Sequence, residues 1–167
     1  YFARLRSRVM SAGRRGVYVS VMLFEGWGMQ FVRDAWRAHP SNPDNNVRGI
    51  GSDPNSDGKG REVHELSDPQ MTAVQEAYVR KVLDTLGDLD NVLYEISNEN
   101  HPASTEWQYH MIRLIHDYES TRPMQHPVGM EQVDALRPPV FALCLNVSHG
   151  PVGMMTHALD MDVIGKQ

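Results

Sequence analysis

Two runs of almost uninterrupted apolar and β-branched residues constrain the fold of this chain most strongly. They cover residues 17–24 (VYVSVMLF) and 91–97 (NVLYEIS). Strands buried on both faces, as in a parallel sheet covered by helices, have this composition, whereas half-exposed strands alternate apolar and polar residues. The sequence therefore predicts a parallel sheet with helices on its faces.

Helical segments precede and separate the two runs. Residues 1–14, 67–86 and 104–119 place apolar side chains at helical spacing, and Asp68-Pro69 is typical of a helix start. In the second of these helices the expected apolar face consists of Met71, Val74, Ala77, Tyr78, Lys81, Val82, Thr85 and Leu86. Alternating helices and strands are typical of right-handed βαβ units, so we predict an α/β fold.

Further strands are expected at 126–130 and 140–147, and Trp107 is expected to pack in the core. Residues 25–69 are dominated by Gly, Pro, Asn and Asp. A loop of this length is usually functional or disordered.

Part of this loop resembles a calcium-binding loop. Asp53, Asn55 and Asp57, followed by Gly58, match its first six positions, but its twelfth position, where Glu is expected, is His64. The alternative is a turn-rich loop in which the Asp and Asn side chains cap backbone amides.

Composition excludes several classes of function. The 167 residues carry a formal net charge of −5, which provides no basic surface for nucleic acid. The apolar runs are too short to span a membrane. A single cysteine permits neither an internal disulfide nor a cysteine metal cluster, and no cofactor is expected. The length fits one domain, 1–167.

The chain starts at Tyr1 rather than Met, so we expect it to be part of a longer protein. The location of that protein is left open between secreted, periplasmic and other compartments.

The second apolar run ends in Asn98-Glu99, which places an acid beside an amide at a strand tip. Glu99 is the candidate proton donor, whereas Glu95, inside the strand, is expected to be a structural residue with a polar partner. Candidate substrate-binding residues nearby are Asn98, Glu25, Trp27 and His101. A Trp can stack on the apolar face of a sugar, but Trp27 and Trp36 can equally pack the loop against the sheet.

Three segments carry a resemblance to a known family. They are GVYVSVMLFEGW (16–27), HPSNPDNNVRGI (39–50) and DPQMTAVQEAYVRKVLDTLGDLDNVLYEISNEN (68–100). Together they resemble the middle of a cellulase-like (β/α)8-barrel glycoside hydrolase of clan A, similar to family 5, in a bacterial branch. The resemblance covers residues 1 to about 130, and residues 131–167 form a tail that does not match.

The resemblance implies a partial TIM barrel, about strands three to five or six with their helices, truncated at both ends. It implies that Glu99 is the general acid/base of a retaining enzyme and that Asn98 binds the sugar 2-hydroxyl of an oligo- or polysaccharide. The family's nucleophile lies on the seventh strand, and Asp134, Asp160 and Asp162 match no nucleophile motif. We therefore expect the chain alone not to hydrolyse glycosides.

Two alternatives remain open. One is a barrel relative that binds carbohydrate, or serves a structural role, without catalysis. The other is an unrelated α/β metal-dependent hydrolase that uses Glu99 with His101 and His126, although their spacing fits no established metal motif.

Overall fold

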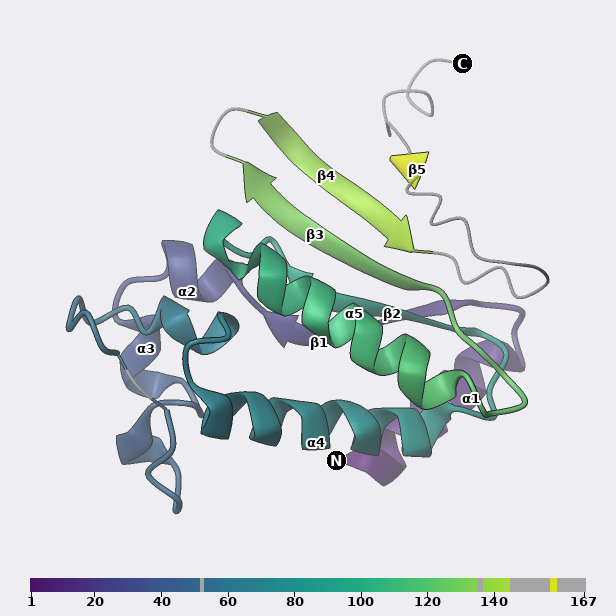
Figure 1. Cartoon of the computed structure of the whole chain (residues 1–167). Helices are drawn as coiled ribbons and strands as arrows, with labels where there is room; N and C mark the ends of the chain where they lie inside the picture. Colours follow the sequence, from purple (N-terminus) through teal and green to yellow (C-terminus); the bar gives the residue numbers. More distant parts are fainter. Residues whose placement is uncertain (52, 135–136, 145–156, 159–167) are drawn as a thin grey trace.

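The computed structural model describes residues 1–51, 53–134, 137–144 and 157–158 (Figure 1). Strands β1 (Val19–Glu25), β2 (Val92–Asn98) and β3 (Val128–Asp134) run parallel to one another. Strands β4 (Arg137–Cys144) and β5 (His157–Ala158) extend the sheet in the order β1-β2-β3-β4-β5 with antiparallel pairing. The described strands form an open sheet, and the predicted α/β class is confirmed.

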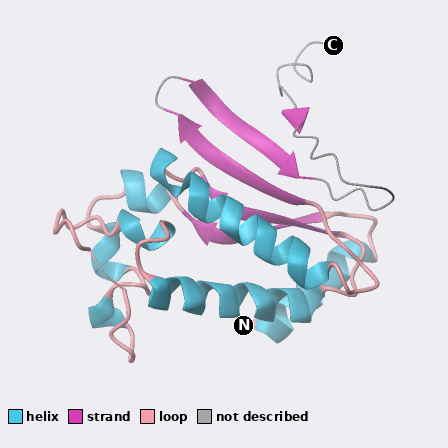
Figure 2. Ribbon diagram, viewed as in Figure 1, coloured by secondary structure: helices cyan, strands magenta, loops and turns pink. Residues whose placement is uncertain are grey.

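The helices link the parallel strands. Helix α1 (Phe2–Gly13) precedes β1, α4 (Pro69–Leu86) connects β1 to β2, and α5 (Thr105–Glu119) connects β2 to β3. Helices α4 and α5 run side by side along the sheet (Figures 1 and 2). The three helices lie within one or two residues of the expected segments, because amphipathic periodicity and caps such as Asp68 determine them locally.

The expected strand at 140–147 overlaps β4, which covers 137–144 and runs antiparallel to β3, while residues 145–147 lie outside the described residues. Only two residues separate β3 from β4 in the sequence, and a connection this short joins antiparallel neighbours, since parallel strands need a crossover of a dozen or more residues. β4 is therefore not a further strand of the parallel series. Asp134 ends β3, while Asp160 and Asp162 lie outside the described residues.

The apolar face of α4 differs in part from the expected one. Val79 and Leu83 are fully buried although neither was expected on that face, and Val74 is 38% exposed. Helix α4 packs against both the sheet and α5, so its buried side is rotated toward α5. Trp107 of α5 is fully buried, as predicted, and its Nε1 donates to Oε1 of Gln75 on α4.

The long loop contains structure that its composition did not indicate. Helices α2 (Trp27–Phe31) and α3 (Ala35–Ala38) and the 3-10 turns η1 (Pro43–Asn45) and η2 (Arg61–His64) lie within it. A second small core of Met29, Trp36, Val63 and Met71 holds these pieces together. A third 3-10 turn, η3 (Pro102–Ser104), leads into α5. Among the described residues, the helices are too short or too polar to cross a bilayer.

Candidate functional site

Strands β1 and β2 end side by side. Glu25 is the register partner of Asn98, and the Gly26 amide donates to the Asn98 carbonyl at 3.0 Å. The Asn98 side chain lies 3.5 Å from Oε1 of Glu25. Because the strands are parallel, their carboxyl ends bring Glu25, Asn98 and Glu99 to the same edge of the sheet.

Glu99 directly follows β2 in a left-handed backbone conformation, with φ at +41°. This conformation is uncommon for a residue other than Gly, Asn or Asp, and such strain is concentrated at functional sites. The Gln30 side chain of α2 donates to the Glu99 carbonyl and holds this turn. The Glu99 side chain is half-buried.

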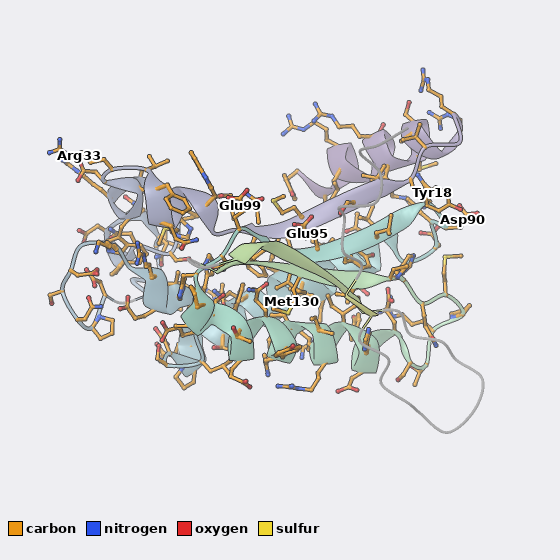
Figure 3. All side chains as sticks on the ribbon, turned by 90° about the horizontal axis from the view of Figure 1, so that it is seen from above. Tyr18, Arg33, Asp90, Glu95, Glu99 and Met130 are labelled. Carbon is orange, nitrogen blue, oxygen red and sulfur yellow. The ribbon has the colours of Figure 1, made fainter. Side chains whose placement is uncertain are left out.

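Glu95 lies part-way along β2, whereas Glu99 lies beyond its end (Figure 3). The Glu95 side chain is 9% exposed, and Ser20 of β1 donates to it at 3.5 Å. The expected polar partner of Glu95 is therefore present. The left-handed turn ends the regular alternation of side chains, so the period of the strand does not fix the direction of Glu99.

Helix α2 forms one side of the tip. Both carboxylate oxygens of Glu25 accept from the Gly28 amide, at 3.0 and 2.9 Å, and so cap this short helix. Trp27 and Phe31 are 44% and 56% exposed, with ring centroids 5.8 Å apart. Packing of the loop, the alternative role for both Trp residues, holds for Trp36, which is 7% exposed in the second core. Trp27 is not one of the buried residues of that core, and its role in sugar binding stays a prediction.

A buried polar network lies beneath the tip. Asn100 is fully buried, and its Oδ1 accepts from the His101 amide at 2.9 Å. Its Nδ2 donates to Oγ of Ser97 at 2.9 Å and to Nδ1 of His64 at 3.0 Å. The carbonyl and both amide hydrogens of Asn100 are thus used.

His64 is 2% exposed and stacks on Trp107, with ring centroids 4.7 Å apart. Burial, together with the nearby His39 and His101, lowers the pKa of His64 to about 3, so its ring is neutral. The sequence did not indicate this network, because Asn100 and His64 lie 36 positions apart and neither belongs to a periodic pattern.

His101 is buried, and its Nε2 donates to the Arg61 carbonyl at 3.1 Å. Burial lowers the pKa of His101 despite this hydrogen bond. The ring thus anchors η2 beneath the tip, and Nε2 is used within the protein.

His126 lies toward the other end of the sheet. Its ring contacts Tyr94, with centroids 5.3 Å apart, and Tyr94 to Asn98 is four residues, or about 13 Å of strand. Its two ring nitrogens bond to Glu119 and to the Leu89 carbonyl. His126 therefore does not join Glu99 and His101. In the described part of the chain, His, Cys, Asp and Glu side chains form no group of three or more suited to a metal ion.

The oxygens of the calcium-like loop bond to backbone amides of the same loop. Asp53 accepts from Gly58 at 2.8 Å, Asn55 accepts from Asp57 at 2.8 Å, and Asp57 accepts from Lys59 at 2.9 Å. This is the arrangement of the turn-rich alternative.

Comparisons of the chain with protein-family models, with curated proteins and with solved structures found no match.

Proposed function

We propose that this chain is the part of a cellulase-like (β/α)8-barrel glycoside hydrolase that carries its proton donor, Glu99. The observation that carries the proposal is the joint position of Glu25, Asn98 and Glu99 at the carboxyl ends of two adjacent parallel strands. In barrel enzymes the active site lies on that face. The succession β1-α4-β2-α5-β3 fits consecutive βα units of a barrel, whereas β4 does not follow that plan.

The proposed reaction is cleavage of a glycosidic bond in an oligo- or polysaccharide. Glu99 gives its proton to the glycosidic oxygen as the bond from that oxygen to the anomeric carbon breaks. In a retaining enzyme, a second carboxylate attacks the anomeric carbon, and Glu99 then removes a proton from the water that releases the sugar. No residue is assigned to this second role.

Other residues at the tip support sugar binding. The contact between Asn98 and Glu25 is long, at 3.5 Å, so the Asn98 amide remains available to a sugar hydroxyl. Trp27 and Phe31 present exposed rings one helical turn apart, and such rings stack on the apolar faces of pyranoses. Gln30 is a positioning residue, since it holds the backbone of Glu99.

Binding and catalysis are tested separately. Titration of the chain with cello-, manno- and xylo-oligosaccharides, followed by tryptophan fluorescence, is expected to show saturable binding. Trp27→Ala is expected to weaken binding about tenfold or more, within the range for a lost aromatic anchor. Tyr109→Ala, which removes a similarly exposed ring on α5, serves as the matched control. Equal effects of the two variants would count against a sugar site at α2.

The proton donor is tested with phenyl glycosides and azide. Azide takes the place of the unassigned nucleophile, attacks the anomeric carbon and gives a glycosyl azide, while phenol leaves with the proton from Glu99. Mass spectrometry is expected to detect this product, with Glu99→Gln reducing its rate by roughly 10² to 10⁴. Glu95→Gln is the control inside the same strand. Equal rates of glycosyl azide formation in the wild type and in Glu99→Gln would show that Glu99 is not the proton donor.

A second candidate is carbohydrate binding without hydrolysis. It is favoured by the contacts of the Glu25 carboxylate, which caps α2 and lies against Asn98, so that this carboxylate serves the structure of the tip. Saturable sugar binding with no glycosyl azide from any of the aryl glycosides would select this candidate.

A further inference from the structure

A cavity of about 1290 Å³ lies beside the candidate site, between the end of β1, the first half of α4 and residues 39–50. Glu25 lines it, so the cavity begins at the tip that carries Asn98. Small-molecule sites in proteins commonly have volumes of roughly 300–1,000 Å³, which this cavity exceeds.

The outer wall of the cavity is held in place by Asn46. Its Nδ2 donates to the carbonyls of Pro40, Asn42 and Ile50, at 3.3, 3.0 and 2.9 Å. Its Oδ1 accepts from the amides of Arg48 and Ile50, at 3.2 and 3.1 Å. These five hydrogen bonds hold residues 40–50 in one loop conformation, so this wall of the cavity is preformed.

At the inner end of the cavity, His64 offers a hydrogen-bond donor. Its Nδ1 accepts from Asn100, and the neutral ring therefore carries its proton on Nε2. Among the residues that the structure describes, Asn100 is the hydrogen-bond partner of this ring, and Nε2 has none. His64 lines the cavity, and its Nε2 is not among the described buried atoms that lack a partner, so this N–H is accessible from the cavity. An occupant with an acceptor atom gains a hydrogen bond there.

His39 adds a second donor at the same end. Its ring lies edge-on to His64, with centroids 6.3 Å apart, and it also lines the cavity. The Ser41 amide donates to its Nδ1 at 3.1 Å, so the neutral ring carries its proton on Nε2. Burial lowers the pKa of His39, which favours this neutral form.

The remaining lining is largely apolar. The apolar lining includes Leu23 and Phe24 of β1 and Val74, Ala77 and Tyr78 of α4, and the rings of Phe24 and Tyr78 are in contact, with centroids 5.5 Å apart. Val74 is 38% exposed, which is explained by its position on this wall. Glu25 and Arg48, of opposite charge, also line the cavity, so the lining provides no net charge to attract an ion, and its apolar walls favour burial of an apolar body.

We propose that this cavity binds a neutral, mainly apolar small molecule that carries an acceptor oxygen, with the oxygen accepting hydrogen bonds from Nε2 of His64 and of His39. The site goes beyond the proposed glycoside chemistry, because it uses neither Glu99 nor Asn98. The ligand is recognised by hydrogen bonds at its polar end and by apolar contacts along the rest of its body.

The probe for this site is a neutral naphthyl ketone, compared with the naphthyl hydrocarbon of the same shape that lacks the carbonyl. Binding is followed through the ring ¹⁵N and ¹H signals of the histidines. The ketone is expected to shift the Nε2 signals of His64 and His39 and to bind at least about tenfold more tightly than the hydrocarbon, as the two hydrogen bonds to its oxygen imply. Equal affinity of the two ligands, or shifts that spare His64, would overturn the proposal.

Variants locate the site. Ala77→Trp fills the cavity from an exposed position on α4 and is expected to abolish binding of the ketone. Arg113→Trp introduces the same ring at an exposed position of α5 and is expected to leave binding unchanged, as is Glu99→Gln. His39→Phe is expected to weaken binding of the ketone but not of the hydrocarbon. Retained binding of the ketone in Ala77→Trp would refute the site. The site would also be refuted if the chain self-associates and binds neither ligand until it is diluted to monomer.

Discussion

The ring of His126 and the carboxylate of Glu119 form a buried hydrogen-bonded pair, with Nδ1 2.7 Å from Oε1 and each side chain 2% exposed. The other oxygen of Glu119 accepts from the His126 amide at 2.8 Å, and Nε2 of His126 bonds to the Leu89 carbonyl at 2.9 Å. The pair thus joins the end of α5 to the start of β3 and to the turn before β2.

At or below pH 6, where the raised pKa keeps His126 protonated, Glu119→Gln is expected to destabilise the chain by about 3–5 kcal/mol, because it removes one partner of a buried charged pair and leaves the other. Urea unfolding measures the change. Asp88→Asn, which breaks the exposed pair between Asp88 and Arg6, is the matched control and is expected to have a much smaller effect. Equal effects of the two variants on the free energy of unfolding would mean that burial of the His126–Glu119 pair adds nothing to stability.

The same pair predicts a dependence of stability on pH. Burial lowers the pKa of His126, but the hydrogen bonds to Glu119 and Leu89 outweigh burial and raise the pKa overall. Folding therefore favours the protonated ring. The resulting stabilisation is fully present below the ordinary histidine pKa near 6.5 and is lost as pH rises through the raised value. Unfolding free energies from pH 6 to 9 should fall by a smaller amount in His126→Gln than in the wild type.

His64 has the opposite dependence. Its folded pKa is lowered to about 3, so the unfolded chain binds the proton more readily. Stability from the neutral ring is complete above pH 6.5 and declines by about 1.4 kcal/mol per pH unit between pH 6.5 and 3. His64→Phe should flatten this part of the stability profile, and His110→Phe is the control at a partly exposed histidine of α5. An unchanged slope in His64→Phe would contradict the assignment.

Glu99→Gly is expected to stabilise the chain by about 1 kcal/mol, because glycine accepts the left-handed conformation without the steric cost of a side chain. The same variant should lose the glycosyl azide product. Asp34→Gly, at φ +57° on an exposed loop, should give a smaller gain, because Asp tolerates this conformation better than Glu, and should leave product formation unchanged. A loss of stability in Glu99→Gly alone would show that the side chain of Glu99 is needed for folding.

Gly26→Ala is expected to cost about 1–3 kcal/mol and to weaken sugar binding. An added Cβ would lie 2.6 Å from Cα and Cγ of Asn100, and Asn100 cannot retreat because its amide is fully bonded. Thermal unfolding and the oligosaccharide titration measure the two effects. Gly16→Ala, where a Cβ would meet nothing within 4 Å, should lower stability through its positive φ alone and leave sugar binding intact.

Local chemistry explains which parts of the fold the sequence predicted. The amphipathic period fixes α1, α4 and α5, with the Asp68 cap added at α4, and the continuous apolar runs fix β1 and β2, because each signal lies within the segment that it describes. The strand tip at Asn98 and Glu99 was predictable for the same reason. The antiparallel pairing of β4 was not predictable from its residues, since the two-residue connection to β3, rather than the composition of β4, determines it.

The environment of the tip depends on contacts between distant segments, which no local pattern reveals. Gln30 reaches the carbonyl of Glu99, and His64 reaches Asn100, across 69 and 36 positions of sequence. The loop that brings them there looked irregular by composition, yet Asn46 and Trp36 give it a definite shape. The single Asn side chain that closes such a loop leaves no periodic signal in the sequence.

Asn100 has a consequence for how this protein can vary among its relatives. Asp at this position would lack the two donors, and Leu would lack both the donors and the acceptor. Asn is therefore the side chain of this size that can make the hydrogen bonds to Ser97, His64 and His101. Gly26 is tied to the same position by steric contact. Gly26, His64 and Asn100 are therefore expected to be inherited as a unit, and these three positions form a signature by which distant homologues of this chain can be recognised.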